Sequence, residues 1–197
     1  MNIIGVTGPS GAGKSLLGSY ISSLGVPSID ADRVYHSLLI PPSECLDSLR
    51  SVFGDRIFNS DGSLDRAALG KIVFSDPHKL ELLNQTVLPR VLNKIRALID
   101  EYQKLGHLTV VLDGPTLIES GFDKECDTVI SVLCDKSLRI DRITSRDNIS
   151  REKAEARINA QHDDSFYIEN SDYILYNNEN AETFISQAEQ LLKDIII

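Results

Sequence analysis

Short apolar runs alternate with segments of helical periodicity along the chain. Within the runs, apolar residues follow one another directly, which is typical of strands in a parallel sheet covered on both faces. Helices between successive strands supply the crossovers, and such crossovers are right-handed. The pattern therefore predicts an α/β fold with a doubly wound parallel sheet, whose strands fall at residues 3–6, 26–29, 108–112, 128–134 and 173–176.

The interval between residues 29 and 108 contains no strand candidate. A single crossover helix needs only part of that length, so the interval predicts an inserted helical lobe. We place the lobe at about residues 33–105, inside a single domain whose core is formed by about 1–32 and 106–197. Pro89 suits the first turn of a helix in this lobe. The apolar stripe of that helix consists of Val91, Ile95, Leu98 and Tyr102.

Directly after the first apolar run, residues 5–15 read GVTGPSGAGKS. This segment contains the G-x-x-x-x-G-K-[ST] pattern, follows a strand candidate and leads into an apolar helical face. Glycines let the backbone wrap an anion with its N–H groups pointing inward, and the following helix adds its positive N-terminal end. The segment predicts a P-loop that binds a nucleoside triphosphate through Gly8, Ser10, Gly11, Ala12, Gly13, Lys14, Ser15 and Leu16.

Three side chains near this loop predict its chemistry. Lys14 is expected to contact the β- and γ-phosphates, and the Ser15 hydroxyl to ligate the Mg²⁺ ion that bridges them. Asp113 closes the third strand candidate. Its carboxylate is either a second Mg²⁺ ligand, acting through water, or an ordinary loop carboxylate.

Two aspartates, Asp30 and Asp32, follow the second strand candidate. In a doubly wound sheet, ligands lie outside the carboxyl ends of the strands, so either acid is a candidate for the reaction centre. An aspartate can accept the proton of an alcohol that attacks the terminal phosphate. Either residue could instead cap the helix that starts here. We favour Asp32 as the catalytic base and leave both readings open for Asp30.

Basic residues concentrate between residues 136 and 157 of this acidic chain. Arg139, Arg142 and Arg146 are spaced to line one helix face, and DNIS at residues 147–150 breaks the helix before a second one begins. A solvated helix face would explain these charges, since acidic residues are interspersed. Arginine also grips phosphate oxygens bidentately, so we favour a lid over bound triphosphate at about residues 139–161.

Composition narrows the classes of function. The chain has 197 residues and a net charge of −9, which disfavours non-specific nucleic-acid binding. No apolar run is long enough for a membrane span. The three cysteines lack metal-ligand spacing and are expected in the core. They are Cys45, Cys126 and Cys134. Their odd number and wide spacing favour a protein of the reducing cytoplasm. The four histidines are scattered and are expected to be surface or packing residues.

Five segments together resemble the dephospho-coenzyme A kinase family. They are the P-loop, LGVPSIDADRVYHSLL, FGDRIFNSDGSLDRAALGKIVFSD, VVLDGPTLIESG and RITSRDNISREKAEARINAQ, in the family's order and spacing. The resemblance implies a kinase that uses MgATP to phosphorylate the ribose 3′-hydroxyl of dephospho-coenzyme A. It also implies a P-loop core, a helical lobe that holds the acceptor, and an arginine-bearing lid.

The resemblance assigns roles to further residues. Asp32 matches the position of the family's catalytic base. Arg142 matches a lid residue that contacts phosphate or adenine, and Asn177 matches a residue beside the adenine. Arg66 matches a contact to an acceptor phosphate, although it could simply lie on the surface of a helix start. Pro115 falls at the acceptor site, in PTLIE where many members carry PLLFE.

Departures from the family pattern weaken the prediction of the acceptor more than the prediction of phosphoryl transfer. Pro9 stands where a glycine is common, and Leu88 precedes Pro89 where many members carry histidine.

The alternatives are another small-molecule P-loop kinase, with a nucleoside, nucleotide or shikimate-like acceptor, or a GTPase-like switch. Against a switch, no N-K-x-D sequence is present to read guanine. The sequence leaves the oligomeric state open.

Overall fold

The computed structural model describes residues 1–196, which form two compact units. The first unit combines residues 1–29 with the chain from Glu101 onward, and the second is Asp30–Asp100. The second unit is therefore inserted into the first along the sequence.

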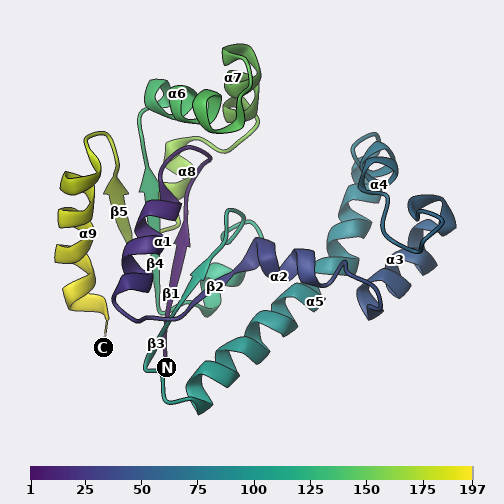
Figure 1. Cartoon of the computed structure of the whole chain (residues 1–197), viewed down its shortest axis with the longest axis horizontal. Helices are drawn as coiled ribbons and strands as arrows, with labels where there is room; N and C mark the ends of the chain where they lie inside the picture. Colours follow the sequence, from purple (N-terminus) through teal and green to yellow (C-terminus); the bar gives the residue numbers. More distant parts are fainter. Residues whose placement is uncertain (197) are drawn as a thin grey trace. The chain divides into compact units, whose positions relative to one another are not determined.

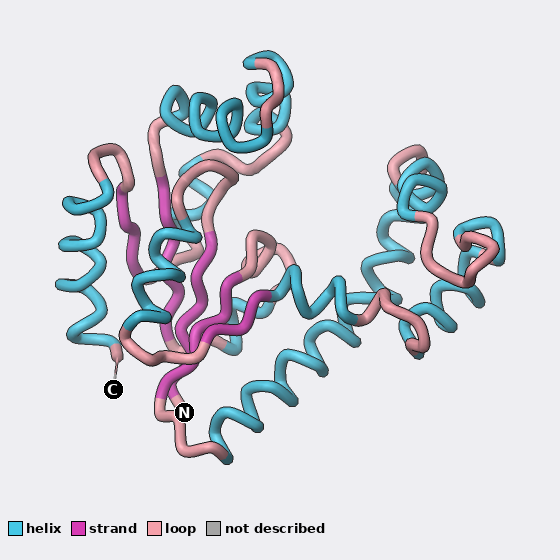
Figure 2. Tube along the Cα trace, viewed as in Figure 1, coloured by secondary structure: helices cyan, strands magenta, loops and turns pink. Residues whose placement is uncertain are grey.

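A five-stranded sheet organises the first unit (Figures 1 and 2). The strands are β1 (Asn2–Thr7), β2 (Ser28–Asp30), β3 (Thr109–Asp113), β4 (Thr128–Leu133) and β5 (Tyr173–Tyr176), in the order β2-β3-β1-β4-β5. β1 pairs in parallel with both β3 and β4, and β4 pairs in parallel with β5. The predicted α/β fold and its five strands are confirmed, with strand ends shifted by one or two residues.

Helices and loops cover both faces of this sheet. On one face, α1 (Lys14–Ser23) and α9 (Ala181–Ile195) contribute buried residues to the same core as Ile4 and Val6 of β1. The other face packs against the segment after β3, including η2 (Phe122–Glu125), and α8 (Asp164–Glu169) contacts β4. Gly5 faces that segment, where a Cβ would lie 2.6 Å from Leu117 Cδ2. A side chain there would separate the sheet from its cover.

Two helices form the predicted lid segment within the first unit (Figure 1). α6 (Lys136–Asp147) ends at Asn148, whose left-handed φ of 50° stops the helix, and the Ser150 side chain caps α7 (Arg151–Asn159). Ile140 and Ile143 of α6 pack against Ala154 of α7 in a small apolar cluster. The predicted break at residues 147–150 is confirmed.

The second unit is helical. It contains α2 (Ala31–Ser37), α3 (Glu44–Phe53), η1 (Asp55–Ile57), α4 (Arg66–Val73) and most of α5 (Pro77–Lys104). Of the predicted apolar stripe, Val91 and Ile95 are buried, while Leu98 and Tyr102 are half-buried. Ile99, which the stripe did not include, is buried as well. Over residues 1–196, no helix is both long and apolar enough to cross a membrane.

The predicted start of α5 at Pro89 is wrong. Pro89 lies inside a helix that begins at Pro77. The start signal is Asp76-Pro77: the Asp76 carboxylate accepts a hydrogen bond from the His78 N–H at 3.0 Å, and proline suits the first helical position. Pro89 cannot donate to the carbonyl of Gln85, but one missing bond does not end a helix that tertiary packing holds.

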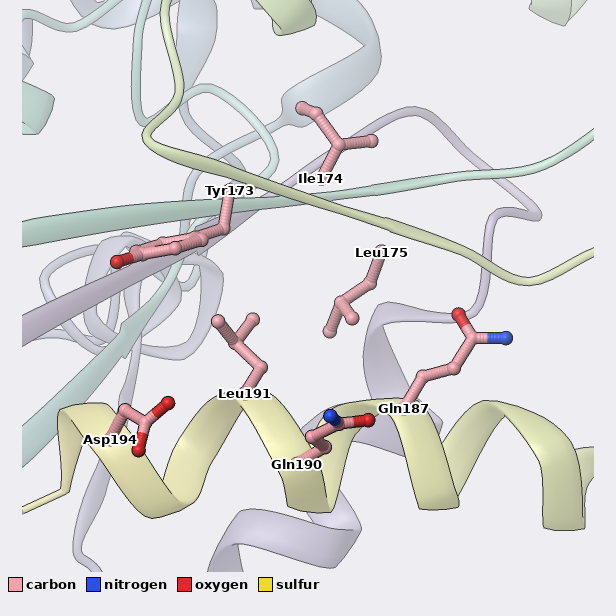
Figure 3. Close-up of a pocket in the computed structure, with 7 residues that line it drawn as sticks. All are labelled: Tyr173, Ile174, Leu175, Gln187, Gln190, Leu191 and Asp194. Atoms are coloured by element: carbon pink, nitrogen blue, oxygen red, sulfur yellow. The ribbon is translucent and has the colours of Figure 1, made fainter.

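A shallow pocket of about 280 Å³ lies at the β5 edge of the sheet, against α9 (Figure 3). Leu175 and Leu191 extend toward each other from the strand and the helix, and polar side chains of α9 rim the opening. None of the predicted site residues lines this pocket. Its position therefore adds nothing to the assignment of the reaction centre.

Candidate active site

The P-loop connects β1, in the middle of the sheet, to α1. The chain passes from β1 to β2 and β3 on one side and later to β4 on the other, so the strand order reverses beside β1. Ligands of doubly wound folds bind at such a reversal, outside the carboxyl ends of the strands. The predicted phosphate loop therefore lies where the fold places a ligand.

Glycine is required at Gly8, Gly11 and Gly13 for two reasons. Their φ angles are 133°, 80° and 110°, in a region that residues with a Cβ rarely adopt. Space is also lacking, since a Cβ on Gly8 would lie 2.2 Å from the carbonyl oxygen of Val132. The loop is thus pressed against β4 in a backbone conformation that a nonglycine sequence could not hold without strain.

The N-terminal end of α1 closes the loop. Lys14 is the first helical residue, and no side chain caps the helix at Gly13. The Lys14 ammonium donates to the Gly8 carbonyl at 2.7 Å, which draws the two ends of the loop together. Uncapped N–H groups and the helix dipole favour an anion at this position. Inside the loop, the Ala12 N–H donates to the Pro9 carbonyl at 3.2 Å, so Pro9 serves as the acceptor of a turn.

Two predicted ligand-binding side chains, Arg142 and Asn177, bind backbone carbonyls of this loop. Arg142 Nη1 lies 3.3 Å from the carbonyl oxygens of both Gly11 and Ala12, and Arg142 Nη2 donates to the Asn177 carbonyl at 3.0 Å. Asn177 Nδ2 donates to the Ala12 carbonyl at 2.8 Å. A Cβ on Gly13 would lie 2.0 Å from that Nδ2 atom, so glycine leaves the space that Asn177 occupies.

Arg139 brings a buried charge to the same loop. Its side chain is buried, with the residue only 5% exposed, and its Nε donates to the Ser10 carbonyl at 3.0 Å. Within residues 1–196, no carboxylate lies at ion-pair distance from it. Burial lowers the pKa of the guanidinium, but arginine stays charged at neutral pH. Its hydrogen-bond acceptors are neutral, and the Asp164 carboxylate acts on the guanidinium without forming an ion pair, so Arg139 adds positive charge beside the loop.

The three lid arginines therefore differ from one another. Arg139 is buried and Arg142 is half-buried, both against the P-loop, while Arg146 is exposed and pairs with Asp147. The alternative interpretation of these arginines as a solvated helix face fits Arg146, but it does not fit Arg139 or Arg142. These two arginines concentrate positive charge at the loop of a protein whose net charge is −9.

Asp113 and Pro115 also lie at the carboxyl edge of the sheet. Asp113 is the last residue of β3 and is in register with Val6 of β1, two positions before Gly8. The next residue, Gly114, donates its N–H to the Val6 carbonyl at 3.1 Å. Pro115 follows in the turn after β3 and is half-buried.

In the second unit, the structure separates the two aspartates. Asp30 caps α2, because its Oδ1 accepts a hydrogen bond from the Arg33 N–H at 2.9 Å. Asp32 lies on the first turn of α2 and is exposed. His36 is one helical turn further along the same face, and its Nε2 lies 3.3 Å from Nη1 of Arg66, the first residue of α4. The sequence predicted His36 as a surface or packing residue, and it is exposed, but the contact with Arg66 was not predicted.

Comparisons with known proteins agree on one family. A family model described as dephospho-CoA kinase matches residues 2–183. A dephospho-CoA kinase of Fusobacterium nucleatum is 34% identical over 98% of both chains. That of Symbiobacterium thermophilum is 41% identical over 82% of this chain and 67% of its own length.

Solved structures extend the comparison to the fold. A dephospho-CoA kinase from Campylobacter jejuni has a TM-score of 0.73 and 28% identity, and covers 98% of this chain and 96% of its own. A crystal structure from Thermus thermophilus reaches a TM-score of 0.82 at 29% identity, over 100% of this chain and 98% of its own. A shikimate kinase from Acinetobacter baumannii, at 18% identity and a TM-score of 0.54, shares the P-loop kinase fold. With a family match over most of its length and a phosphate loop in place, this chain belongs to the dephospho-CoA kinase family.

Proposed function

We propose that this protein transfers the γ-phosphoryl group of ATP to the ribose 3′-hydroxyl of dephospho-coenzyme A. The observation that carries the proposal is the match of residues 2–183 to the dephospho-CoA kinase family, with a formed P-loop that presents Lys14. The family match favours this acceptor over the nucleoside, nucleotide or shikimate-like acceptors of other P-loop kinases. A reducing cytoplasm as the site of action is part of the proposal, and the free state of Cys45, Cys126 and Cys134 agrees with it.

Phosphate binding is assigned to the loop and the start of α1. Backbone N–H groups of the loop and of the first turn would hold the phosphate oxygens, and Lys14 would leave the Gly8 carbonyl to meet the β- and γ-phosphates. Arg142 and Arg139 add positive charge behind the loop, which favours the charge that develops during transfer. Both backbone groups of Ser10 are already engaged by side chains, so its contact with ATP would come from the hydroxyl.

Magnesium is assigned to Ser15 and Asp113. Both offer hard oxygen donors, and Asp113 ends β3 beside the strand that leads into the loop. No cluster of three or more acidic, histidine or cysteine ligands occurs within residues 1–196. This donor set fits an ion that completes its shell with water and phosphate oxygens. When bound, Mg²⁺ would neutralise charge on the β- and γ-phosphates.

Acceptor activation is assigned to Asp32. Its exposed carboxylate stands on the first turn of α2, and it would take the proton from the 3′-hydroxyl as the oxygen attacks phosphorus. Arg66, supported by His36, is assigned to an acceptor phosphate because its guanidinium fork suits that anion. Pro115 is assigned to the wall of the acceptor site.

The test is ATP turnover with dephospho-coenzyme A, compared with shikimate and nucleosides, on the parent protein and on Asp32→Asn. Of the acceptors tested, we expect only dephospho-coenzyme A to support turnover. In Asp32→Asn, kcat should fall at least about 10²-fold, which is the contribution expected of a general base. Binding of an ATP analogue should be unchanged. Asp47→Asn is the matched control, since Asp47 is an exposed acid on the first turn of α3. Turnover that survives in Asp32→Asn would place the base elsewhere, and turnover without acceptor would favour a hydrolase.

A further inference from the structure

Gln161, the second residue after α7, contacts the P-loop from the end of the lid segment. Its Oε1 accepts a hydrogen bond from the Ser10 N–H at 3.1 Å and another from Arg139 Nη2 at 3.0 Å. A backbone N–H and a guanidinium can only donate, so the amide oxygen is the atom that faces them. One side-chain oxygen therefore joins the phosphate loop to the first lid helix.

Arg139 completes a closed set of bonds around Ser10. Its Nε donates to the Ser10 carbonyl at 3.0 Å, while Gln161 accepts from the Ser10 N–H. Both backbone groups of one loop residue are thus held by two side chains that also bind each other. Arg139 is buried, which limits its freedom to rotate away.

This arrangement fixes peptide orientation on the phosphate side of the loop. In a trans peptide the carbonyl and the following N–H point in opposite directions. Holding the Ser10 carbonyl outward therefore turns the Gly11 N–H toward the other side. Arg142 and Asn177 hold the next two carbonyls, those of Gly11 and Ala12. The Ala12 N–H already donates to the Pro9 carbonyl, so the N–H groups that this orientation leaves for phosphate are those of Gly11 and Gly13. Three successive peptide planes are set by donors behind the loop.

We propose that Gln161 is a positioning residue that sets the phosphate loop for nucleotide before the nucleotide arrives. It acts through Arg139 and Ser10 and does not itself touch the phosphates. Dipoles that are already aligned need no reorganisation when charge arrives, so the arrangement favours ATP binding and transfer. Because Gln161 follows α7 and Arg139 lies on α6, the same bonds couple the order of the lid to the order of the loop. The inference rests on the proposed function only in taking ATP as the nucleotide.

The experiment compares three variants of the full chain. Gln161→Met keeps the length of the side chain but removes the acceptor, and Gln161→Glu keeps an acceptor for both bonds. Gln190→Leu, an exposed glutamine on α9, is the control for removing an amide. The measurements are the Kd of a non-hydrolysable ATP analogue without acceptor, the KM for each substrate, kcat and Tm.

We expect Gln161→Met to raise the Kd of the analogue and the KM for ATP about ten-fold, as two hydrogen bonds are lost, one of them to a charged group. The KM for dephospho-coenzyme A should stay within about two-fold, and Gln161→Glu should keep the Kd within about three-fold of the parent. An unchanged Kd in Gln161→Met would overturn the proposal. So would an equal rise of both KM values together with a lower Tm, which indicates general destabilisation.

A measurement on the unaltered protein guards against a variant that does not fold. The Ser10 amide should exchange with deuterium much more slowly than an open loop amide, since Gln161 accepts its hydrogen bond. Exchange at the rate of an unstructured chain would overturn the proposal. Binding of the analogue needs no acceptor, so a protein that binds ATP but leaves dephospho-coenzyme A unchanged contradicts the proposed function and not this inference.

Discussion

Gly13 and Gly18 lie five positions apart, but the structure requires glycine only at the first of them. Gly13 has a φ of 110° and its missing side chain leaves space for the Asn177 amide. Gly18 lies inside α1, where an added Cβ would meet nothing within 4 Å. The first glycine is demanded by the site, while the second only weakens a helix.

Alanine at each position should therefore have opposite effects on the free energy of unfolding. Gly13→Ala is expected to lower it by about 1–3 kcal/mol through backbone strain, and to weaken ATP binding at least about ten-fold. Gly18→Ala is expected to raise it by about 0.5–1 kcal/mol, with ATP binding unchanged. Thermal unfolding and calorimetric titration of both variants check this. A Gly13→Ala protein that binds ATP like the parent would show that the loop can rebuild around Asn177.

The two lid helices are tied together by a carboxylate at the end of α6. Asp147 accepts hydrogen bonds from Arg146 Nε at 2.7 Å and from Arg157 of α7. The bond from Arg146, followed by that from Arg157, lowers the pKa of the Asp147 carboxyl to about 2. The ionised form is therefore favoured in the folded lid, and it fixes the relation of α6 to α7.

This carboxylate should make lid stability depend on pH in the acid range. Because the folded pKa lies below the ordinary value of 3.8, the contribution is complete above that value and is lost as the pH falls toward 2. We expect Asp147→Asn to lower Tm by about 2 °C at pH 7, the size of exposed ion pairs. The difference from the parent protein should shrink between pH 4 and pH 2. Differential scanning calorimetry over this range is the measurement, and a constant difference would contradict the assignment.

Some elements could be predicted from local pattern and others could not. The strands β1 and β4 are buried on both faces, so their consecutive apolar residues indicate them directly. The start of α5 was missed because Pro89 matches the rule for a first turn as well as Pro77 does. A helix that extends beyond a proline depends on packing of its buried residues, which periodicity around one proline does not reveal.

The candidate site likewise contains residues that the local sequence predicts and contacts that it does not predict. Gly8, Lys14 and Ser15 belong to a contiguous motif whose mechanism fixes the spacing, so the sequence alone predicts them as members of the candidate site. The donors to the loop carbonyls come from residues 139–177 and contact the loop across 129 to 165 positions, from Arg139 to Asn177. Such contacts exist only after the sheet has formed, and no local period encodes them. Sequence reasoning placed Arg142 and Asn177 near the nucleotide but not against the loop carbonyls.

The two units should respond to different ligands in hydrogen exchange. By the proposed function, an ATP analogue binds the loop and lid of the first unit, and dephospho-coenzyme A binds residues of the second. We therefore expect the analogue to slow amide exchange in residues 8–16 and 139–161, and the acceptor to slow exchange in residues 32–37 and 64–70. Mass spectrometry of peptides from each complex measures this. Protection by the acceptor confined to the first unit would place its site outside the helical unit.

The central position of β1 has a consequence for synthesis of the protein. β1 is made first, yet its sheet neighbours are β3, about a hundred residues later, and β4 beyond it. Asn177, whose amide binds the Ala12 carbonyl, leaves the ribosome later still. A nascent chain that lacks it has glycines in the motif but no finished cradle for phosphate. During translation, the cradle around the phosphate loop therefore stays incomplete until residue 177 has emerged.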